Sequence, residues 1–536
     1  MCINTKKEDH ALCPPMAGSF KNLFFELLHC IIVQIHWLFD CVVDFVFGLI
    51  YDSKAKKVPP VKNPLLLESA ISLAEKIRNK KVTSENVVKS FIDRCEEVNA
   101  IINAITEERY AEAIKEAKAV DKLIESGINP EEIKKLKPFL GIPFTTKESN
   151  EVKGMLHTLG LLSRKDYQSP RDATVVAYLK EAGGILIATT NVPELNLWME
   201  SRNNLYGQTG NPYNNTRTAG GSSGGEGAII AACGSAISIG SDIGGSTRMP
   251  AFYNGVFGHK PSENLASLKG VGLRQKDFPN SMAQAGPICK RAEDLAPLLK
   301  VLIGDKVSLL KLDENVDLSK LNIFYQEGSG DLKASKMSKT MKDTMKKAVR
   351  HFEDVAASTQ KIKIPGTEYT FKLWRFWMSQ EEADFKYDIT NRKYRANAKT
   401  ELFKLIKGSS ELTLAAIVKL LDEDYLPKED PEWAKATTAC MKSYLLEKLG
   451  DNGVLFYPSA PFPASYHYSA FFRPYNFGYW CLFNVLRIPC CQVPLGLDEN
   501  GLPVGIQVAA APNNDHLCIA VAKELEAAFG GWVPPS

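Results

Sequence analysis

Hydrophobic and polar residues alternate along this chain with two periods, one of about 3.6 residues and one of about two. Apolar residues recur at helical spacing in four segments: residues 65–78, 83–98, 107–126 and 173–182. Short apolar runs predict strands at 141–146 and 185–190, and the second run directly follows the pair Gly183-Gly184. Helices that alternate with strands in this way predict an α/β fold.

Composition divides the rest of the chain. Residues 219–258 are rich in glycine, whereas residues 305–450 are rich in lysine, poor in glycine and mostly helical in pattern. Near the C-terminus, the apolar runs 492–497 and 505–510 flank the pair Asn500-Gly501. An Asn-Gly pair between two such runs predicts a β-hairpin.

One segment near the N-terminus is apolar enough to engage a membrane. Leu23 to Ile50, at about 1.5 Å per helical residue, is long enough to cross a bilayer. Six polar residues interrupt this segment: Glu26, His29, Gln34, His36, Asp40 and Asp44. All of them except Gln34 fall within an arc of about 80° on a helical wheel, which makes a polar stripe on an otherwise apolar helix.

Three interpretations of this helix remain open. It lies in the membrane interface, it spans the membrane with its stripe against a partner helix, or it packs on the body of the protein. Lysines and prolines between residues 54 and 64 predict a stiff linker after it. We therefore expect residues 1–62 to form a membrane-associating helix with its linker, and residues 63–536 to form one large domain.

Charge and composition exclude several classes of function. The 536 residues carry 65 basic and 62 acidic side chains, a net charge of +3, so we expect no nucleic-acid partner. The twelve cysteines contain no Cys-x-x-Cys pair and are expected to be reduced thiols. The eight histidines show no metal-ligand spacing, so we expect neither a metal site nor a cofactor.

Three stretches carry candidate chemistry. They are a predicted strand that ends in a lysine, Gly141 to Glu148, and two glycine-rich stretches, Gly220 to Gly227 and Gly240 to Pro250. Glycine permits tight turns and close backbone approach in any protein, so each stretch alone is a weak indicator of a site. The glycine patterns of P-loop and dinucleotide-binding proteins are absent from the sequence.

An esterase interpretation is also open at this point. Ser222 and Ser223 each fit Gly-x-Ser-x-Gly, the nucleophile elbow of α/β-hydrolases. That chemistry would need a downstream acid and base, for which Asp515 and His516 are the candidates.

Taken together, the three stretches resemble the amidase signature family, whose catalytic triad is a lysine, a bridging serine and a nucleophilic serine. The resemblance continues through Pro250-Ala251 and Lys260-Pro261-Ser262, and it extends from about Leu65 to the C-terminal hairpin. Within the family the chain is most similar to the type 2 fatty-acid amide hydrolases, in its apolar N-terminus, in Ala292 to Pro297 and in Gly530 to Val533. The resemblance implies one large domain with a central twisted mixed β-sheet covered by helices.

The family's chemistry implies a role for each of three residues. Ser246 would attack the amide carbonyl and form an acyl-enzyme, with Ser222 relaying the proton to Lys147. Lys147 can act as the base if burial lowers its pKa from about 10.4 toward neutrality. It would later return the proton to the leaving amine, which leaves poorly unless it is protonated.

Other residues of the two glycine-rich stretches are expected to support this chemistry. The oxyanion hole is expected to consist of the backbone N–H groups of Ile243, Gly244, Gly245 and Ser246. Ser223 either holds Ser222 by a hydrogen bond or is a turn serine. Asp242 and Arg248, which flank the nucleophile, are expected to orient its loop.

The leading hypothesis is a membrane-associated serine amidase that hydrolyses fatty-acid amides to free fatty acid and amine or ammonia. Its partners would be a lipid-like amide and an intracellular membrane, and a homodimer is compatible with the resemblance. The alternatives are an amidase of small soluble amides, a component of an amidotransferase, an esterase that uses Ser222 or Ser223 with His516, and a non-catalytic membrane scaffold.

Overall fold

The computed structural model describes the backbone of residues 19–535 and the side chains of residues 31–535. Its main sheet contains β1 Ile105–Glu108, β2 Pro143–Lys147, β3 Ile185–Thr190, β8 Ile237–Asp242, β9 Phe257–Lys260, β10 Gln284–Cys289, β11 Asn322–Tyr325, β12 Ser358–Lys361, β13 Gly453–Pro458, β14 Cys490–Leu497 and β15 Pro503–Ala510. The strand order is β1-β3-β2-β8-β10-β9-β14-β15-β13-β11-β12, with parallel and antiparallel pairs. Two small ribbons pair β4 Arg202–Asn203 with β5 Gly207–Gln208, and β6 Gly210–Asn211 with β7 Asn214–Thr218.

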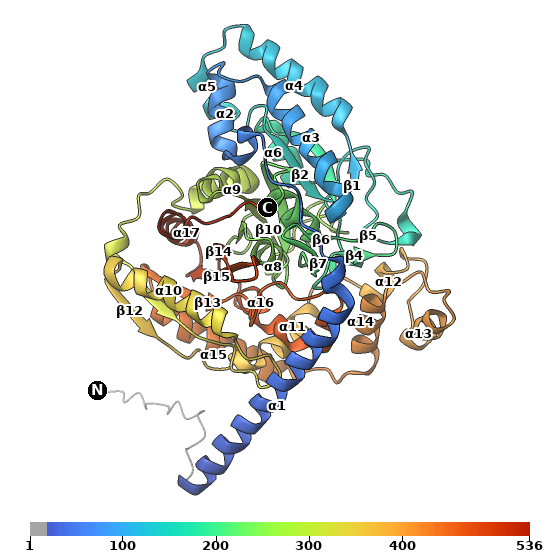
Figure 1. Ribbon diagram of the computed structural model, residues 1–536, viewed down its shortest axis with the longest axis vertical. Coiled ribbons are helices and arrows are strands. Elements are labelled where there is room, and N and C mark those ends of the chain that lie inside the picture. The colour runs from blue at the N-terminus through green and yellow to red at the C-terminus, as the bar shows by residue number, and fades with distance from the viewer. Residues whose placement is uncertain (1–18, 536) are drawn as a thin grey trace, which may run out of the picture.

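Helices surround this sheet, as Figure 1 shows. They are α1 Ser19–Tyr51, α2 Ala70–Arg78, α3 Ser84–Ile102, α4 Tyr110–Glu125, α5 Pro130–Leu136, α6 Thr174–Glu181, α7 Gly224–Ala231, α8 Arg248–Tyr253, α9 Leu295–Ile303, α10 Lys339–Val355, α11 Thr370–Met378, α12 Phe385–Asp388, α13 Ala398–Ile406, α14 Leu414–Tyr425, α15 Pro431–Leu449, α16 Gly478–Val485 and α17 Asp515–Phe529. The predicted α/β fold, one large domain with a mixed sheet, is confirmed.

Several predicted elements are confirmed close to their predicted bounds. The strand predicted at 185–190 is β3, and the predicted C-terminal hairpin is formed by β14 and β15. The helix predicted over 107–126 begins only at Tyr110, because Ile105–Glu108 pairs with β3 as an edge strand. The prediction failed there because strand pairing with a distant segment overrides the local periodicity.

The sheet brings two strand ends together at the site. Strand β2 lies between β3 and β8 and runs parallel to both. The carboxyl ends of parallel neighbours meet at the same edge of a sheet. Lys147, the last residue of β2, therefore lies beside Ser241 and Asp242, the last two residues of β8.

Residues 31–54, which comprise most of α1 and the short 3-10 helix after it, are long and apolar enough to cross a membrane by length and composition. The last turns of α1 pack on the body of the protein, and its N-terminal part projects beyond the body (Figure 1). Arg473 Nε donates to Asp40 Oδ1 at 2.8 Å, and Arg473 Nη1 donates to Asp44 Oδ1 at 2.8 Å. The acidic residues Asp40 and Asp44 thus face the body of the protein, as the third interpretation of this helix supposed, whereas the side chains of Glu26 and His29 lie outside the described ones.

The opposite side of α1 is apolar and unpartnered within the described chain. Its exposed side chains are Ile31, Ile32, Ile35, Trp37, Leu38, Phe39, Val42, Phe45, Val46, Leu49 and Ile50. The linker after α1 packs against the body of the protein. Val58 is buried in the main core, and Arg94 donates to the carbonyl of Pro59 at 2.7 Å.

Candidate active site

Lys147 is the centre of the polar cluster at the carboxyl end of β2. Its Nζ donates to Ser222 Oγ at 2.9 Å and to Ser241 Oγ at 2.9 Å, and its side chain is fully buried. The contact with Ser222 brings together two of the residues proposed from the sequence. The contact with Ser241 was not predicted, although Ser241 belongs to the second glycine-rich stretch.

Burial governs the charge of this lysine. Removal from water disfavours the ammonium and lowers the pKa of Lys147 to about 7, although the nearby carboxylates of Asp242 and Glu226 oppose the shift. The direction agrees with the sequence-based expectation. A large fraction of Lys147 is therefore a neutral amine near pH 7, the form that can accept a proton.

Ser222 and Ser246 both line one cavity. Ser222 is buried just before α7, and Ser246 is partly exposed just before α8. The described residues contain no hydrogen bond between these two side chains. Ser223 does not hold the Ser222 hydroxyl; its backbone N–H donates to the Ser246 carbonyl at 3.2 Å, which joins the two loops.

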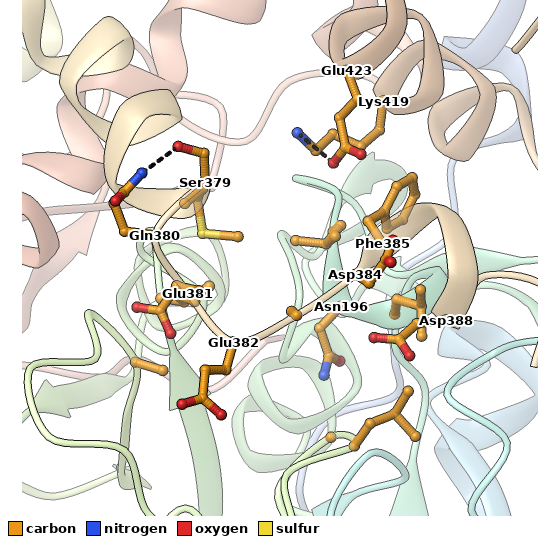
Figure 2. Close-up of a pocket in the computed structure, with 18 of the residues that line it drawn as sticks. Asn196, Ser379, Gln380, Glu381, Glu382, Asp384, Phe385, Asp388, Lys419 and Glu423 are labelled. Atoms are coloured by element: carbon orange, nitrogen blue, oxygen red, sulfur yellow. Dashed lines mark hydrogen bonds and ion pairs between the residues drawn. The ribbon is translucent and has the colours of Figure 1, made fainter. Parts of the chain in front are cut away.

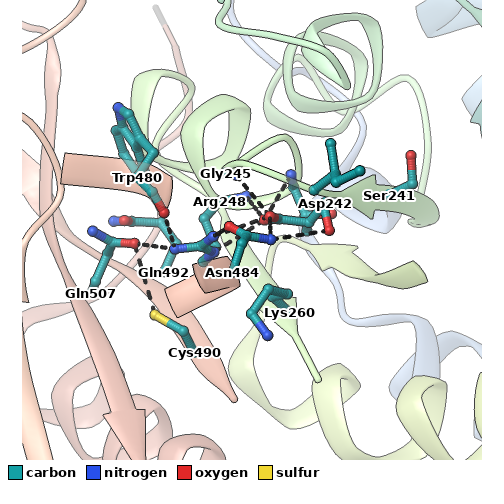
Figure 3. Close-up of polar contacts among 12 residues, drawn as sticks. Ser241, Asp242, Gly245, Arg248, Lys260, Trp480, Asn484, Cys490, Gln492 and Gln507 are labelled. Atoms are coloured by element: carbon teal, nitrogen blue, oxygen red, sulfur yellow. Dashed lines mark hydrogen bonds and ion pairs between the residues drawn. The ribbon is translucent and has the colours of Figure 1, made fainter. Parts of the chain in front are cut away.

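Asp242 and Arg248 form a buried ion pair that supports the loop between them (Figure 3). Arg248 donates from Nε and Nη2 to the two carboxylate oxygens of Asp242, each at 3.0 Å. Burial alone would raise the pKa of Asp242, but the charge and hydrogen bonds of Arg248 outweigh it and lower the pKa to about 2. Arg248 also donates to Asn484 Oδ1 and Gln507 Oε1, which tie the loop to α16 and β15.

The predicted oxyanion donors fall into two groups. The N–H of Gly245 donates to Asp242 Oδ1 at 2.7 Å and is therefore occupied inside the loop. The N–H groups of Ile243, Gly244 and Ser246 make no loop or side-chain hydrogen bond within the described chain. Three of the four expected donors are thus free for an oxyanion.

Aromatic side chains explain why this loop contains glycine. A Cβ at Gly245, where φ is +110°, would lie 2.4 Å from Cβ of Trp480. A Cβ at Gly244 would lie 2.5 Å from Phe477, and the Trp374 indole donates to the Ile243 carbonyl at 2.9 Å. The aromatic residues pack directly on the loop and fix its path.

A buried carboxylate behind the lysine was missed by sequence reasoning. Glu226 on α7 accepts hydrogen bonds from Thr145 Oγ1 at 2.5 Å and Thr190 Oγ1 at 2.8 Å. Burial raises the pKa of Glu226 to about 7, against the opposing effect of these hydroxyls and of Lys147. Glu226 lies in the first glycine-rich stretch, but no local pattern indicates that its helix turns it toward β2 and β3.

The esterase interpretation finds no support at this site. His516 lines a separate depression with Glu314 and Glu524, away from the cavity that contains Ser222. Asp515 instead accepts from His259 Nε2 at 2.9 Å and from Ser262. Among the described side chains, no group of three or more His, Cys, Asp and Glu could hold a metal ion.

The cavity above Ser222 and Ser246 has a volume of about 1230 Å³. Leucines, Ile243 and Phe376 line part of it, whereas charged side chains of the segment 381–429 line its outer wall. Figure 2 shows Glu381 and Glu382 on one side of this wall and Asp384, Asp388 and Glu423 on the other. A ligand in the cavity therefore meets both apolar and charged surfaces.

A mixed sheet with a buried lysine, two serines and a glycine-rich loop at one edge is the arrangement of an amidase. The Amidase family profile matches residues 86–519. The chain is 43% identical over 493 residues to fatty-acid amide hydrolase 2 of Homo sapiens, in an alignment that covers 90% of this chain and 93% of that protein. It is 42% identical over 488 residues to fatty-acid amide hydrolase 2-A of Danio rerio, where the alignment covers 89% and 92%.

Solved structures show the same fold. A fatty acid amide hydrolase superposes with a TM-score of 0.69 at 21% identity, covering 88% of this chain and 86% of that one. A bacterial aryl acylamidase of the amidase signature family superposes with a TM-score of 0.69 at 20% identity, covering 87% and 97%. The chain belongs to the amidase signature family, and it is a hydrolase similar to the fatty-acid amide hydrolases.

Proposed function

We propose that this protein is a membrane-associated serine amidase that hydrolyses fatty-acid amides through an acyl-enzyme on Ser246. The observation that carries the proposal is the buried Lys147, whose Nζ lies 2.9 Å from Ser222 Oγ and whose pKa is lowered to about 7. A neutral lysine in contact with a serine hydroxyl can act as a general base at physiological pH.

The first half of the reaction forms the acyl-enzyme. Lys147 takes the proton of Ser222 while Ser222 takes that of Ser246, so that Ser246 Oγ attacks the amide carbonyl carbon. The free N–H groups of Ile243, Gly244 and Ser246 stabilise the negative charge on the carbonyl oxygen. When the C–N bond breaks, the proton on Lys147 returns through Ser222 to the leaving nitrogen.

The second half releases the acid. Water loses a proton to Lys147 through Ser222 and attacks the ester carbonyl of the acyl-enzyme. The C–O bond to Ser246 breaks, the proton returns to Ser246 Oγ, and the free fatty acid leaves. The Asp242–Arg248 pair takes no part in these proton transfers, because it holds the loop through buried hydrogen bonds.

Two observations support lipid amides as substrates. The relatives with 42–43% identity over most of the chain are fatty-acid amide hydrolases. The exposed apolar side of α1 is the kind of surface that partitions into a bilayer, where such amides reside. We propose that this face of α1 lies in a membrane while its acidic stripe stays on the catalytic body.

A second candidate, an amidase of small soluble amides, is favoured by the charged outer wall of the cavity. Charged groups suit a polar substrate better than a fatty acyl chain. The two candidates share one mechanism and differ in substrate.

The first test compares hydrolysis of a long-chain fatty-acid amide and a short-chain amide in detergent by the wild type, Ser246→Ala and Lys147→Ala. We expect the wild type to cleave the long-chain amide, Ser246→Ala to be inactive, and Lys147→Ala to lose at least about 100-fold in kcat/KM.

The outcomes for these variants test the proposed mechanism and the proposed substrate class separately. Trapping of an acyl-enzyme, seen as a mass increase on Ser246 in the wild type only, is the independent readout. A wild type that cleaves only the short amide, with the same pattern among the variants, leaves the mechanism and overturns the lipid assignment. Undiminished activity in Ser246→Ala overturns the mechanism.

A further inference from the structure

Ser222 lies in a connection that has no regular structure of its own. Residues 219–223 join β7 to α7 and belong to neither element. In the proposed mechanism Ser222 Oγ has to stay within hydrogen-bond reach of Lys147 Nζ, which lies 2.9 Å away. The position of Ser222 therefore depends on contacts that this connection makes with other parts of the chain.

Ser201 makes three such contacts around Ser222. Its side chain is buried, and its Oγ accepts from the backbone N–H of Gly224 at 2.9 Å and donates to the Ser222 carbonyl at 3.3 Å. Its backbone N–H donates to the Gly220 carbonyl at 3.0 Å. One residue thus binds the chain before Ser222, at Ser222 and after it.

The start of α7 explains why this hydroxyl comes from a distant segment. The first N–H groups of a helix have no partner inside it and are commonly bound by the side chain of the residue that precedes the helix. Ser223 occupies that position in α7, but its side chain makes no such bond. Ser201 binds the first of these N–H groups, that of Gly224, in its place.

The segment around Ser201 also packs closely on the glycines beside Ser222. A Cβ at Gly221 would lie 2.4 Å from the carbonyl oxygen of Trp198, and a Cβ at Gly224 would lie 2.5 Å from Ser201 Oγ. Both glycines are thus required by the close approach of this segment. The backbone of Ser222 has little room to move away from it.

We propose that Ser201 is a positioning residue, whose hydroxyl holds the backbone of Ser222 so that Ser222 Oγ stays between Lys147 and Ser246. The inference rests on the proposed function, in which Ser222 relays the protons. Ser201 touches no reacting atom and transfers no proton itself. A displacement of about 1 Å at a reacting group can lower a rate roughly 100-fold.

This role predicts unequal effects on amides and activated esters. Acylation by an amide uses the Ser222 relay twice, first to activate Ser246 and then to protonate the leaving nitrogen. The phenolate of an aryl ester leaves without a proton, so acylation by the ester uses the relay once. A displaced Ser222 therefore slows the amide more than the ester, whereas a general loss of folded enzyme slows both equally.

The experiment measures kcat/KM for an amide and a p-nitrophenyl ester of the same acid in the wild type, Ser201→Ala and Ser201→Thr. We expect Ser201→Ala to lower kcat/KM about 10- to 100-fold for the amide, and to lower it at least about fivefold less for the ester. Ser201→Thr keeps the hydroxyl and should recover most of the amide activity. Rates are expressed per molecule that forms an acyl-enzyme with the ester, so that a poorly folded fraction does not enter the comparison.

Ser235 provides the matched control. It is also a buried serine, and its Oγ donates to the Ile237 carbonyl at 2.9 Å. That contact lies at the start of β8, whereas Asp242 ends the same strand at the site. Ser235→Ala loses a similar hydrogen bond and should leave the ratio of amide to ester kcat/KM unchanged.

The outcomes distinguish this inference from the proposed function. If Ser201→Ala keeps its amide kcat/KM within about twofold of the wild type, or loses it in equal proportion to the ester, the inference is overturned and the proposed function stands. The same change of ratio in Ser235→Ala as in Ser201→Ala also overturns it. If the wild type cleaves no amide, or Ser246→Ala cleaves it undiminished, the proposed function itself fails.

Discussion

At the scale of single residues, the site depends on the charges placed around one buried amine. Lys147 is removed from water, and two carboxylates, Asp242 and Glu226, favour its protonated form while Arg274 disfavours it. Asp242 has its own partner in Arg248, whereas the hydrogen bonds of Glu226 come from neutral hydroxyls. Glu226 is therefore the carboxylate through which the basicity of Lys147 can be changed without breaking an ion pair.

The pH dependence of the wild type follows from this lysine. In the proposed mechanism the reaction needs the neutral amine of Lys147, which is protonated below a pKa of about 7. We expect kcat/KM to fall about tenfold for each pH unit below that pKa and to reach a plateau above it. A rate that is independent of pH between about 5 and 9 would exclude Lys147 as the base.

Glu226→Gln is expected to move this acid limb. The ionised form of Glu226, whose own pKa is about 7, raises the pKa of Lys147, so its removal lowers that pKa and shifts the limb to lower pH. Gln is similar in shape and can keep the contacts with Thr145 and Thr190. The measurement is kcat/KM against pH for both proteins, with Tm as the check on folding, and a limb that stays in place or moves upward contradicts the role given to Glu226.

At the scale of elements, α1 has two sides with different partners. Asp40 and Asp44 face Arg473, and Phe47 packs edge to face on Phe472 with 5.8 Å between the ring centroids. The other side exposes Phe45 at 68% and Leu49 at 72%. Since large apolar side chains are rarely clustered on a surface without a partner, this side is the part of the element suited to lipid.

Phe45→Asp with Leu49→Asp should detach the protein from lipid. An aspartate at the centre of a bilayer costs about 2.5–3.5 kcal/mol. We expect the double variant to lose co-sedimentation with liposomes and to keep its activity on a short soluble amide.

Leu136→Asp is the matched control, since Leu136 is 75% exposed but lies at the end of α5. It should bind liposomes like the wild type. Equal binding by the α1 variant and the wild type would show that this face of α1 is not the membrane contact.

At the scale of the whole molecule, residues far apart in the chain meet at α1. Arg473 is 433 residues from Asp40 in the sequence, and its side chain is only 2% exposed. The pair therefore joins the N-terminal helix to the segment that leads into α16. Ser335 Oγ also donates to Asp40 at 3.1 Å. The N-terminal helix is thus fixed to the catalytic body by buried polar contacts.

Arg473→Met should destabilise this connection. Removal of one partner leaves the Asp40 carboxylate buried without its cation, which costs about 3–5 kcal/mol. We expect a clear decrease in Tm and faster proteolysis of α1.

Replacement of both partners, Asp40→Leu with Arg473→Met, should recover part of the loss, because no charge is then left unpaired. A Tm for Arg473→Met equal to that of the wild type would contradict the structural role of the pair.

The sequence by itself determined the family, the α/β fold and the residue types of the site. Patterns among neighbouring residues were enough to predict these features, because strands, helices and glycine loops each depend on local sequence. For example, β3 follows Gly183-Gly184, and Lys147 ends an apolar strand. The polar stripe of α1, including Asp40, was also visible from its spacing.

The tertiary structure decided what these residues touch. It placed Ser241 and Glu226 around Lys147 and occupied the N–H of Gly245 with Asp242. It also paired Arg473 with Asp40, and this contact determines which side of α1 remains exposed. Such contacts join residues far apart in the chain, and they depend on strand order and helix packing, for which no local pattern carries a signal.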